Sequence, residues 1–164
     1  MYAVKKRILK KSVLGVVLSL SVLTTGVSVA QEANSLDHAK YSTELRQSIF
    51  KLLGSNMGPL GAMAKGKIPV DAKRVEKNAV RINQLSMMIA DYTRTDTSKF
   101  DVKTDALSKI WKETEHFAKG INKLTLASTD LIAAAKTNDE GAIKKAIGGV
   151  GKTCGGCHDD FKAE

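Results

Sequence analysis

Two cysteines and one histidine near the end of the chain are the residues best suited to chemistry. They stand as Cys154-Gly155-Gly156-Cys157-His158, and the 164 residues contain no other cysteine. On a helix, residues three and four apart share a face, so both thiols and the imidazole reach one side. Cys-x-x-Cys-His is the attachment sequence of c-type haem, in which two thiols bond the porphyrin and the histidine ligates the iron. We therefore predict a covalent haem c on Cys154 and Cys157, with His158 as the metal ligand.

Three other uses of a Cys-x-x-Cys pair are open at this point. A thioredoxin-like redox motif accompanies a βαβ pattern, and no such pattern is visible in the sequence. A structural zinc site needs four ligands, and there is no second pair of cysteines. A disulfide between residues three apart on a helix would be strained. Haem attachment is the interpretation that uses both cysteines and the histidine together.

Residues 1–30 have the layout of a secretory signal peptide. Five positive charges precede an apolar run over about 13–23, and Ser28 and Ala30 occupy the −3 and −1 positions of a cleavage site. A membrane span needs about 20 predominantly apolar residues, and this run is shorter and contains two serines. We predict removal of residues 1–30, secretion, and a mature chain 31–164 without a membrane span.

The net charge of the mature chain limits its partners. The whole sequence has 26 basic and 17 acidic residues, and five basic ones lie in residues 1–30, which leaves 21 minus 17, or +4. The remaining lysines are scattered rather than clustered, so we predict no nucleic-acid binding. A net charge of this size favours solubility and attraction to an acidic protein partner.

The spacing of apolar residues predicts helices throughout the mature chain. The first covers about 36–65, with a kink or interruption at Pro59. Its apolar face is expected to contain Leu45, Ile49, Leu52 and Leu53. The second helix begins after Pro69 with Asp71 as its N-cap. A polar connection over 91–103 then precedes a third helix, expected from about 104 to 136.

The fourth helix carries the cysteines. Thr137 and Glu140 fit a capping box at its start, in which the Thr137 hydroxyl accepts a hydrogen bond from the Glu140 N–H. Its apolar positions follow at steps of three and four: Ile143, Ile147, Val150, Cys154, Cys157 and Phe161. Four amphipathic helices joined by short or moderate connections predict an all-α, antiparallel four-helix bundle, in which a cofactor binds between facing helices.

The chain resembles the cytochrome c′ family, the class II c-type cytochromes, whose attachment sequence lies at the C-terminal end of a four-helix chain. The resemblance extends over the mature chain and includes residues 45–48 (Leu-Arg-Gln-Ser), 66–71 and 150–161. It implies a periplasmic homodimer, formed through helices one and two, with one haem per chain. It also implies an electron carrier or a protein that binds a small gas, nitric oxide in particular.

The same resemblance assigns roles on the side of the haem away from His158. The family position four residues after the arginine faces the open side of the iron and holds methionine in low-spin relatives; here it is Phe50. Because phenylalanine has no lone pair for iron, we expect a five-coordinate, high-spin haem. Arg46 and Gln47 match positions near the haem propionates, and a guanidinium can donate two parallel bonds to a carboxylate. Lys162 stands where many relatives have arginine, so this position departs from the family.

Two functions of different classes follow. The first is a periplasmic haem protein that carries electrons or binds a diatomic gas, with Phe50 crowding the open face. The second is an enzyme that turns over nitric oxide or peroxide at the haem. Such chemistry commonly uses a general acid or base, and the sequence places none beside Phe50. We therefore expect a binding or carrier protein without catalytic residues, whose redox partner the sequence does not identify.

Overall fold

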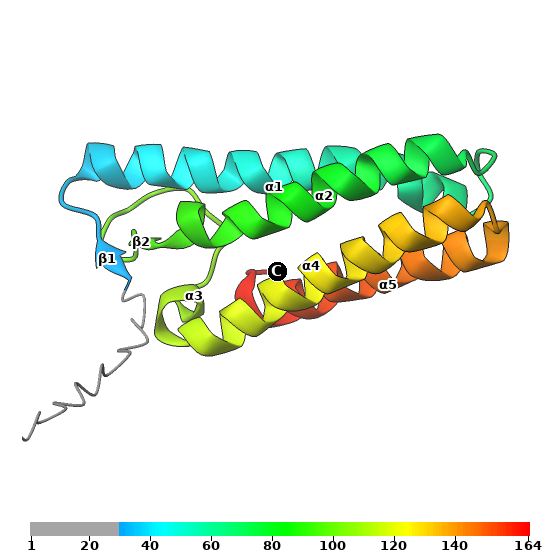
Figure 1. The fold of residues 1–164 in the computed structure, drawn as a ribbon. Coiled ribbons are helices and arrows are strands. Elements are labelled where there is room, and N and C mark those ends of the chain that lie inside the picture. The colour runs from blue at the N-terminus through cyan, green and yellow to red at the C-terminus, as the bar shows by residue number, and fades with distance from the viewer. Residues whose placement is uncertain (1–29) are drawn as a thin grey trace, which may run out of the picture.

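The computed structural model describes residues 30–164, and four long helices make up most of this part of the chain. They are α1 (Leu36–Ala64), α2 (Ala72–Thr93), α4 (Thr114–Thr137) and α5 (Glu140–Phe161), and a one-turn helix, α3 (Lys109–Lys112), precedes α4. Figure 1 shows α1 beside α2 and α4 beside α5, joined as an antiparallel bundle. The predicted fold class is confirmed.

Each helix within residues 30–164 is too short or too polar to cross a bilayer. Residues 1–29 of the predicted signal peptide lie outside the described part of the chain.

The core forms where the apolar faces of the long helices meet. The buried apolar positions of α2 and α5 recur at helical spacing. They are Val75, Ala79, Ile82 and Ile89, at steps of four, three and seven, and Ile143, Ile147, Val150 and Phe161, at steps of four, three and eleven. Burial of an aliphatic or aromatic side chain of this size stabilises the fold by about 1.5–3 kcal/mol. Asp71 caps α2 as predicted, because its carboxylate accepts a hydrogen bond from the backbone of the first turn.

The buried face of α1 differs from the predicted one. Leu52 is 52 % exposed, whereas the charged Arg46 is among the buried residues. The buried positions of the helix are Ala39, Ser42, Thr43, Arg46, Ile49, Leu60 and Met63. The helix also runs through Pro59 without interruption, because Leu60 and Met63 hold its last turns in the core.

The third helix starts later than predicted. The residues before α3 are not helical, because they lie extended against the end of α5. Ala106 pairs with Lys162 in an antiparallel bridge, and the Leu107 N–H donates to the Phe161 carbonyl oxygen at 2.9 Å. The first helical turn therefore begins at Lys109.

A different residue from the one predicted caps α5. Thr137 is the last residue of α4, and Asn138 follows it with a left-handed φ of 56°, a common way for a helix to end. Asp139 is the N-cap of α5, since its carboxylate accepts a hydrogen bond from the Ala142 N–H at 2.6 Å. The predicted capping box at Thr137 is therefore wrong.

Two short strands that the sequence analysis did not predict lie at one end of the bundle. β1 (Gln31–Glu32) pairs in parallel with β2 (Thr95–Asp96), and Lys99 Nζ lies 2.6 Å from the Glu32 carboxylate. In Figure 1 these strands lie at the same end of the bundle as α3. β2 leads into Thr97, a buried residue that contacts the site described next.

Candidate functional site

Two adjoining cavities lie between α1 and the end of α5. Their volumes are about 870 Å³ and about 280 Å³. Four residues line both of them: Phe50, Phe117, Cys157 and His158. Pockets that hold small molecules and cofactors in proteins commonly measure about 300–1,000 Å³. The cysteine–histidine sequence therefore faces a space of the size that a cofactor needs.

Cys154 and Cys157 are half-buried, free thiols on the last turns of α5. Cys154 lines the smaller cavity, and Cys157 and the exposed His158 line both. Burial raises the pKa of both thiols, and the charge of Asp160 raises that of Cys157 further. Cys-x-x-Cys pairs that exchange disulfides instead have an acidic thiol. The environment of these cysteines therefore does not favour a thioredoxin-like role.

A zinc site would need further ligands close to the two cysteines. Within residues 30–164, no group of three or more His, Cys, Asp or Glu side chains is arranged to hold a metal ion.

Helix α4 passes close to one of the thiols at Gly120. A Cβ atom added to Gly120 would lie 3.5 Å from Cys157 Sγ, and this glycine also lines the smaller cavity. A larger side chain here would extend into the space beside the thiol. The sequence analysis missed this contact, because nothing in the local pattern around Gly120 links it to α5.

Phe50 lies on α1, in the wall that faces α5 across the cavities. Its side chain is 37 % exposed and lines both cavities, as His158 does. The structure thus brings together the residue predicted to ligate the iron and the residue predicted to cover its open side. They come from the first and the last helix of the bundle.

Arg46 places a positive charge in the wall of the larger cavity. Its side chain is 2 % exposed, and Nη2 donates to the hydroxyls of Thr43, Thr97 and Thr104 at 3.2, 3.3 and 3.5 Å. Burial lowers the pKa of this guanidinium, and the nearby Asp96 partly offsets the effect. An arginine nevertheless stays protonated in proteins.

Two nitrogens of Arg46 have no hydrogen-bond partner. Nε and Nη1 are both buried and unpaired. Leaving a buried donor unsatisfied costs about 1–3 kcal/mol, and more for a charged group. A carboxylate in the cavity would reduce this cost, because it can accept a charge-assisted hydrogen bond from Nε or from Nη1, which lie on different edges of the guanidinium. The donor set therefore fits an anionic group bound in the larger cavity.

Gln47 and Lys162 also line the larger cavity. Gln47 Nε2 donates to the Lys103 carbonyl oxygen at 2.9 Å and so ties α1 to the connection that follows β2. Lys162 Nζ lies 3.6 Å from the Asp105 carboxylate. These partners were missed in the sequence analysis, because an irregular connection has no periodicity from which the positions of its side chains could be predicted.

Comparison with known proteins agrees with this geometry. The sequence profile described as Cytochrome C' matches residues 42–162. The chain belongs to the cytochrome c′ family. A cytochrome c′ of Rubrivivax gelatinosus is 38 % identical over 119 residues, which cover 73 % of this chain and 92 % of the relative.

Solved structures of cytochrome c′ share the fold. The structure from Shewanella frigidimarina matches with a TM-score of 0.71 at 33 % identity, and the match covers 77 % of this chain and 97 % of the other. A nitric oxide-bound variant from Alcaligenes xylosoxidans matches with a TM-score of 0.68 at 27 % identity and coverages of 77 % and 96 %.

Cytochrome c′ proteins carry a covalently attached haem c, and this chain fits that group. It supplies two thiols and an imidazole in the last turns of one helix, and it supplies a buried guanidinium with unpaired N–H groups. The predictions of family, bundle and cofactor are confirmed. The roles assigned to individual residues remain predictions.

Proposed function

We propose that this cytochrome c′ binds its haem between α1 and α5, attached to Cys154 and Cys157, with His158 as the only protein ligand to the iron. The observation that carries the proposal is the shared lining of the two cavities by Cys157, His158 and Phe50. The smaller cavity is lined mainly by apolar side chains, which suits a macrocycle. Arg46 in the larger cavity suits the propionate carboxylates, and Gln47 beside it ties α1 to the connection that follows β2.

Such a haem would exchange one electron or bind a diatomic gas at its iron. We propose that this chain acts in the periplasm as an electron carrier, a nitric oxide-binding protein, or both. The nitric oxide complex of a relative supports the gas ligand, and the layout of residues 1–30 supports export. Phe50 offers no donor atom, so it leaves the iron five-coordinate and limits access by its bulk.

A carrier or binding role is favoured over catalysis by the residues that line the smaller cavity. Turnover of peroxide or nitric oxide commonly uses a positioned acid or base. The smaller cavity is lined by aliphatic, aromatic and glycine residues together with Met57 and Thr153, and its ionisable side chains are His158 and the two cysteines. Under this proposal all three are engaged with the haem. We therefore propose no catalytic residue.

The Phe50→Ala variant will bind carbon monoxide more tightly than the wild type. Because the ring stands over the open side of the iron, its removal relieves the contact that a bound gas would make. We expect an increase of roughly tenfold or more in affinity, equivalent to about 1.4 kcal/mol. Optical titration of the ferrous protein measures it, with Phe100→Ala as a control, since Phe100 is half-buried and lines neither cavity. Equal affinities in wild type and Phe50→Ala would overturn the steric role.

We also propose a homodimer formed through α1 and α2. Tyr41 and Leu52 are exposed and lie three turns apart on α1, and Val80 and Met87 are exposed two turns apart on α2. Exposed apolar side chains gathered on neighbouring helices are typical of a protein interface.

The Leu52→Asp variant will therefore be monomeric where the wild type is dimeric, because a charge would have to be buried in the interface. Sedimentation velocity over a range of concentrations measures the change. Leu126→Asp is the matched control, since Leu126 is an exposed leucine on α4. A wild type that stays monomeric at all concentrations contradicts the proposal.

A further inference from the structure

Trp111, on α3, lies against the buried guanidinium of Arg46. The guanidinium carbon is 5.2 Å from the centre of the indole ring, within the range of about 6 Å for a cation–π contact. Arg46 lines the larger cavity, whereas Trp111 is absent from the walls of both cavities. Trp111 therefore contacts the site through Arg46.

The indole ring is itself held in a fixed orientation. Its Nε1 donates to the Thr93 carbonyl oxygen at 2.8 Å. Thr93 is the last residue of α2, and carbonyl groups in the last turn of a helix have no partner within that helix. Trp111 thus supplies a partner for this carbonyl, and α2 in return fixes the plane of the indole.

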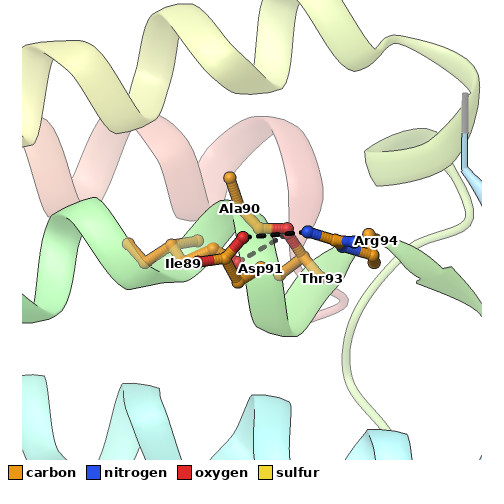
Figure 2. A network of polar contacts seen from close by, with 5 residues as sticks. All are labelled: Ile89, Ala90, Asp91, Thr93 and Arg94. Atoms are coloured by element: carbon orange, nitrogen blue, oxygen red, sulfur yellow. Dashed lines mark hydrogen bonds and ion pairs between the residues drawn. The ribbon is translucent and has the colours of Figure 1, made fainter. Parts of the chain in front are cut away.

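The last turn of α2, which accepts the hydrogen bond from Trp111, is stabilised by contacts among its own residues. Figure 2 shows its side chains: the Thr93 hydroxyl donates to the Ile89 carbonyl oxygen at 2.8 Å, and the Arg94 guanidinium pairs with the Asp91 carboxylate at 3.0 Å. These side-chain contacts stabilise the last turn of α2. The Thr93 carbonyl oxygen, which accepts from Trp111, therefore has a defined position.

Arg46 needs such a contact because its other bonds hold only one of its nitrogens. The three threonine hydroxyls all accept from Nη2, while Nε and Nη1 are unpaired. Bonds to a single nitrogen hold the guanidinium at one corner and leave its other end less constrained. The face of a fixed aromatic ring removes this freedom.

We propose that Trp111 is a positioning residue, which holds the Arg46 guanidinium so that one of its unpaired nitrogens, Nε or Nη1, meets a haem propionate. This inference rests on the proposed function, in which Arg46 meets the propionate. A positive charge held in the protein beside the haem favours the reduced form, because reduction adds one negative charge to the haem. A guanidinium that turns toward solvent is screened and loses this effect. Loss of Trp111 therefore lowers the reduction potential of the haem.

Redox titration of the haem-loaded protein tests the proposal through a double-mutant cycle. We expect Trp111→Leu and Arg46→Gln each to lower the equilibrium constant for reduction by about three- to tenfold, where tenfold corresponds to about 59 mV for one electron. The double variant should have the same potential as Arg46→Gln alone, because Trp111 acts through that side chain. Tyr92→Leu is the control and should leave the potential unchanged, since Tyr92 is a half-buried aromatic residue outside both cavities.

The outcomes separate this proposal from the proposed function. If the effects of Trp111→Leu and Arg46→Gln add, Trp111 acts through packing and the positioning role is overturned. If Arg46→Gln lowers the potential and Trp111→Leu does not, the propionate contact stands and the positioning role is again overturned. An unchanged potential in Arg46→Gln overturns the propionate contact itself.

A second variant, Trp111→Phe, tests the proposal even if Trp111→Leu does not fold. Trp111→Phe keeps an aromatic face beside Arg46 and removes the hydrogen bond to Thr93. We expect its potential to lie between those of the wild type and Arg46→Gln. If Trp111→Phe has the wild-type potential, the hydrogen bond from the indole N–H to Thr93 has no role in positioning Arg46.

Discussion

Replacing both Cys154 and Cys157 by alanine will abolish covalent attachment of the haem. Each thiol can form one thioether bond, so a chain without either holds haem only by contacts and by His158. Under denaturing electrophoresis the haem of the double variant will leave the polypeptide, whereas that of the wild type will stay with it. Intact-mass spectrometry gives the same answer, because the wild type alone will carry the added mass of haem.

The single variants and a neighbour serve as controls for this experiment. Cys154→Ala and Cys157→Ala should each keep one covalent bond and so retain haem on denaturation. Thr153→Ala, next to Cys154 on α5, should keep both bonds. Haem that remains with the double variant after denaturation would show attachment elsewhere and would contradict the site.

Replacing Arg46 by methionine will change stability in opposite directions with and without haem. In the haem-free chain, the variant removes a buried charge with two unpaired nitrogens. We expect the free energy of unfolding to rise by about 1–3 kcal/mol. In the haem-loaded protein, the variant instead loses a charge-assisted hydrogen bond to a propionate, so the free energy of unfolding should fall by about 1.5–3 kcal/mol.

Urea unfolding of the two forms measures both changes. The double alanine variant, with its haem extracted, supplies a haem-free background in which Arg46→Met can be compared with Arg46. Arg81→Met is the control, because Arg81 is exposed on α2 and its replacement should change either form by no more than about 0.5 kcal/mol. A change of the same sign in both forms would contradict a propionate bound by Arg46.

The helices could be predicted where one apolar face meets the core. Val75, Ala79, Ile82 and Ile89 on α2 follow that pattern, and the Asp71 cap marks where the helix begins. On α1 the pattern misled, because Leu52 is apolar but exposed while Arg46 is charged but buried. Departures of this kind from a simple pattern are expected at functional surfaces.

The site could be predicted only where its residues are close together in the sequence. Cys154, Cys157 and His158 lie within five consecutive residues of one helix, so their common role in haem binding could be predicted. The contacts of Arg46 with Thr97 and Trp111 join segments far apart in the chain. An irregular connection contains Thr97 and leads to α3, which carries Trp111, and no periodicity in the sequence specifies how that connection folds.

The central claim is that His158 is the only protein ligand to the iron and that Phe50 stands on the other side. The optical spectrum of the purified protein, recorded in the oxidised and the reduced states, tests this claim most directly. A five-coordinate, high-spin haem in both states is the predicted result. A low-spin spectrum with methionine as the sixth ligand would contradict the account of Phe50 and of the open coordination position.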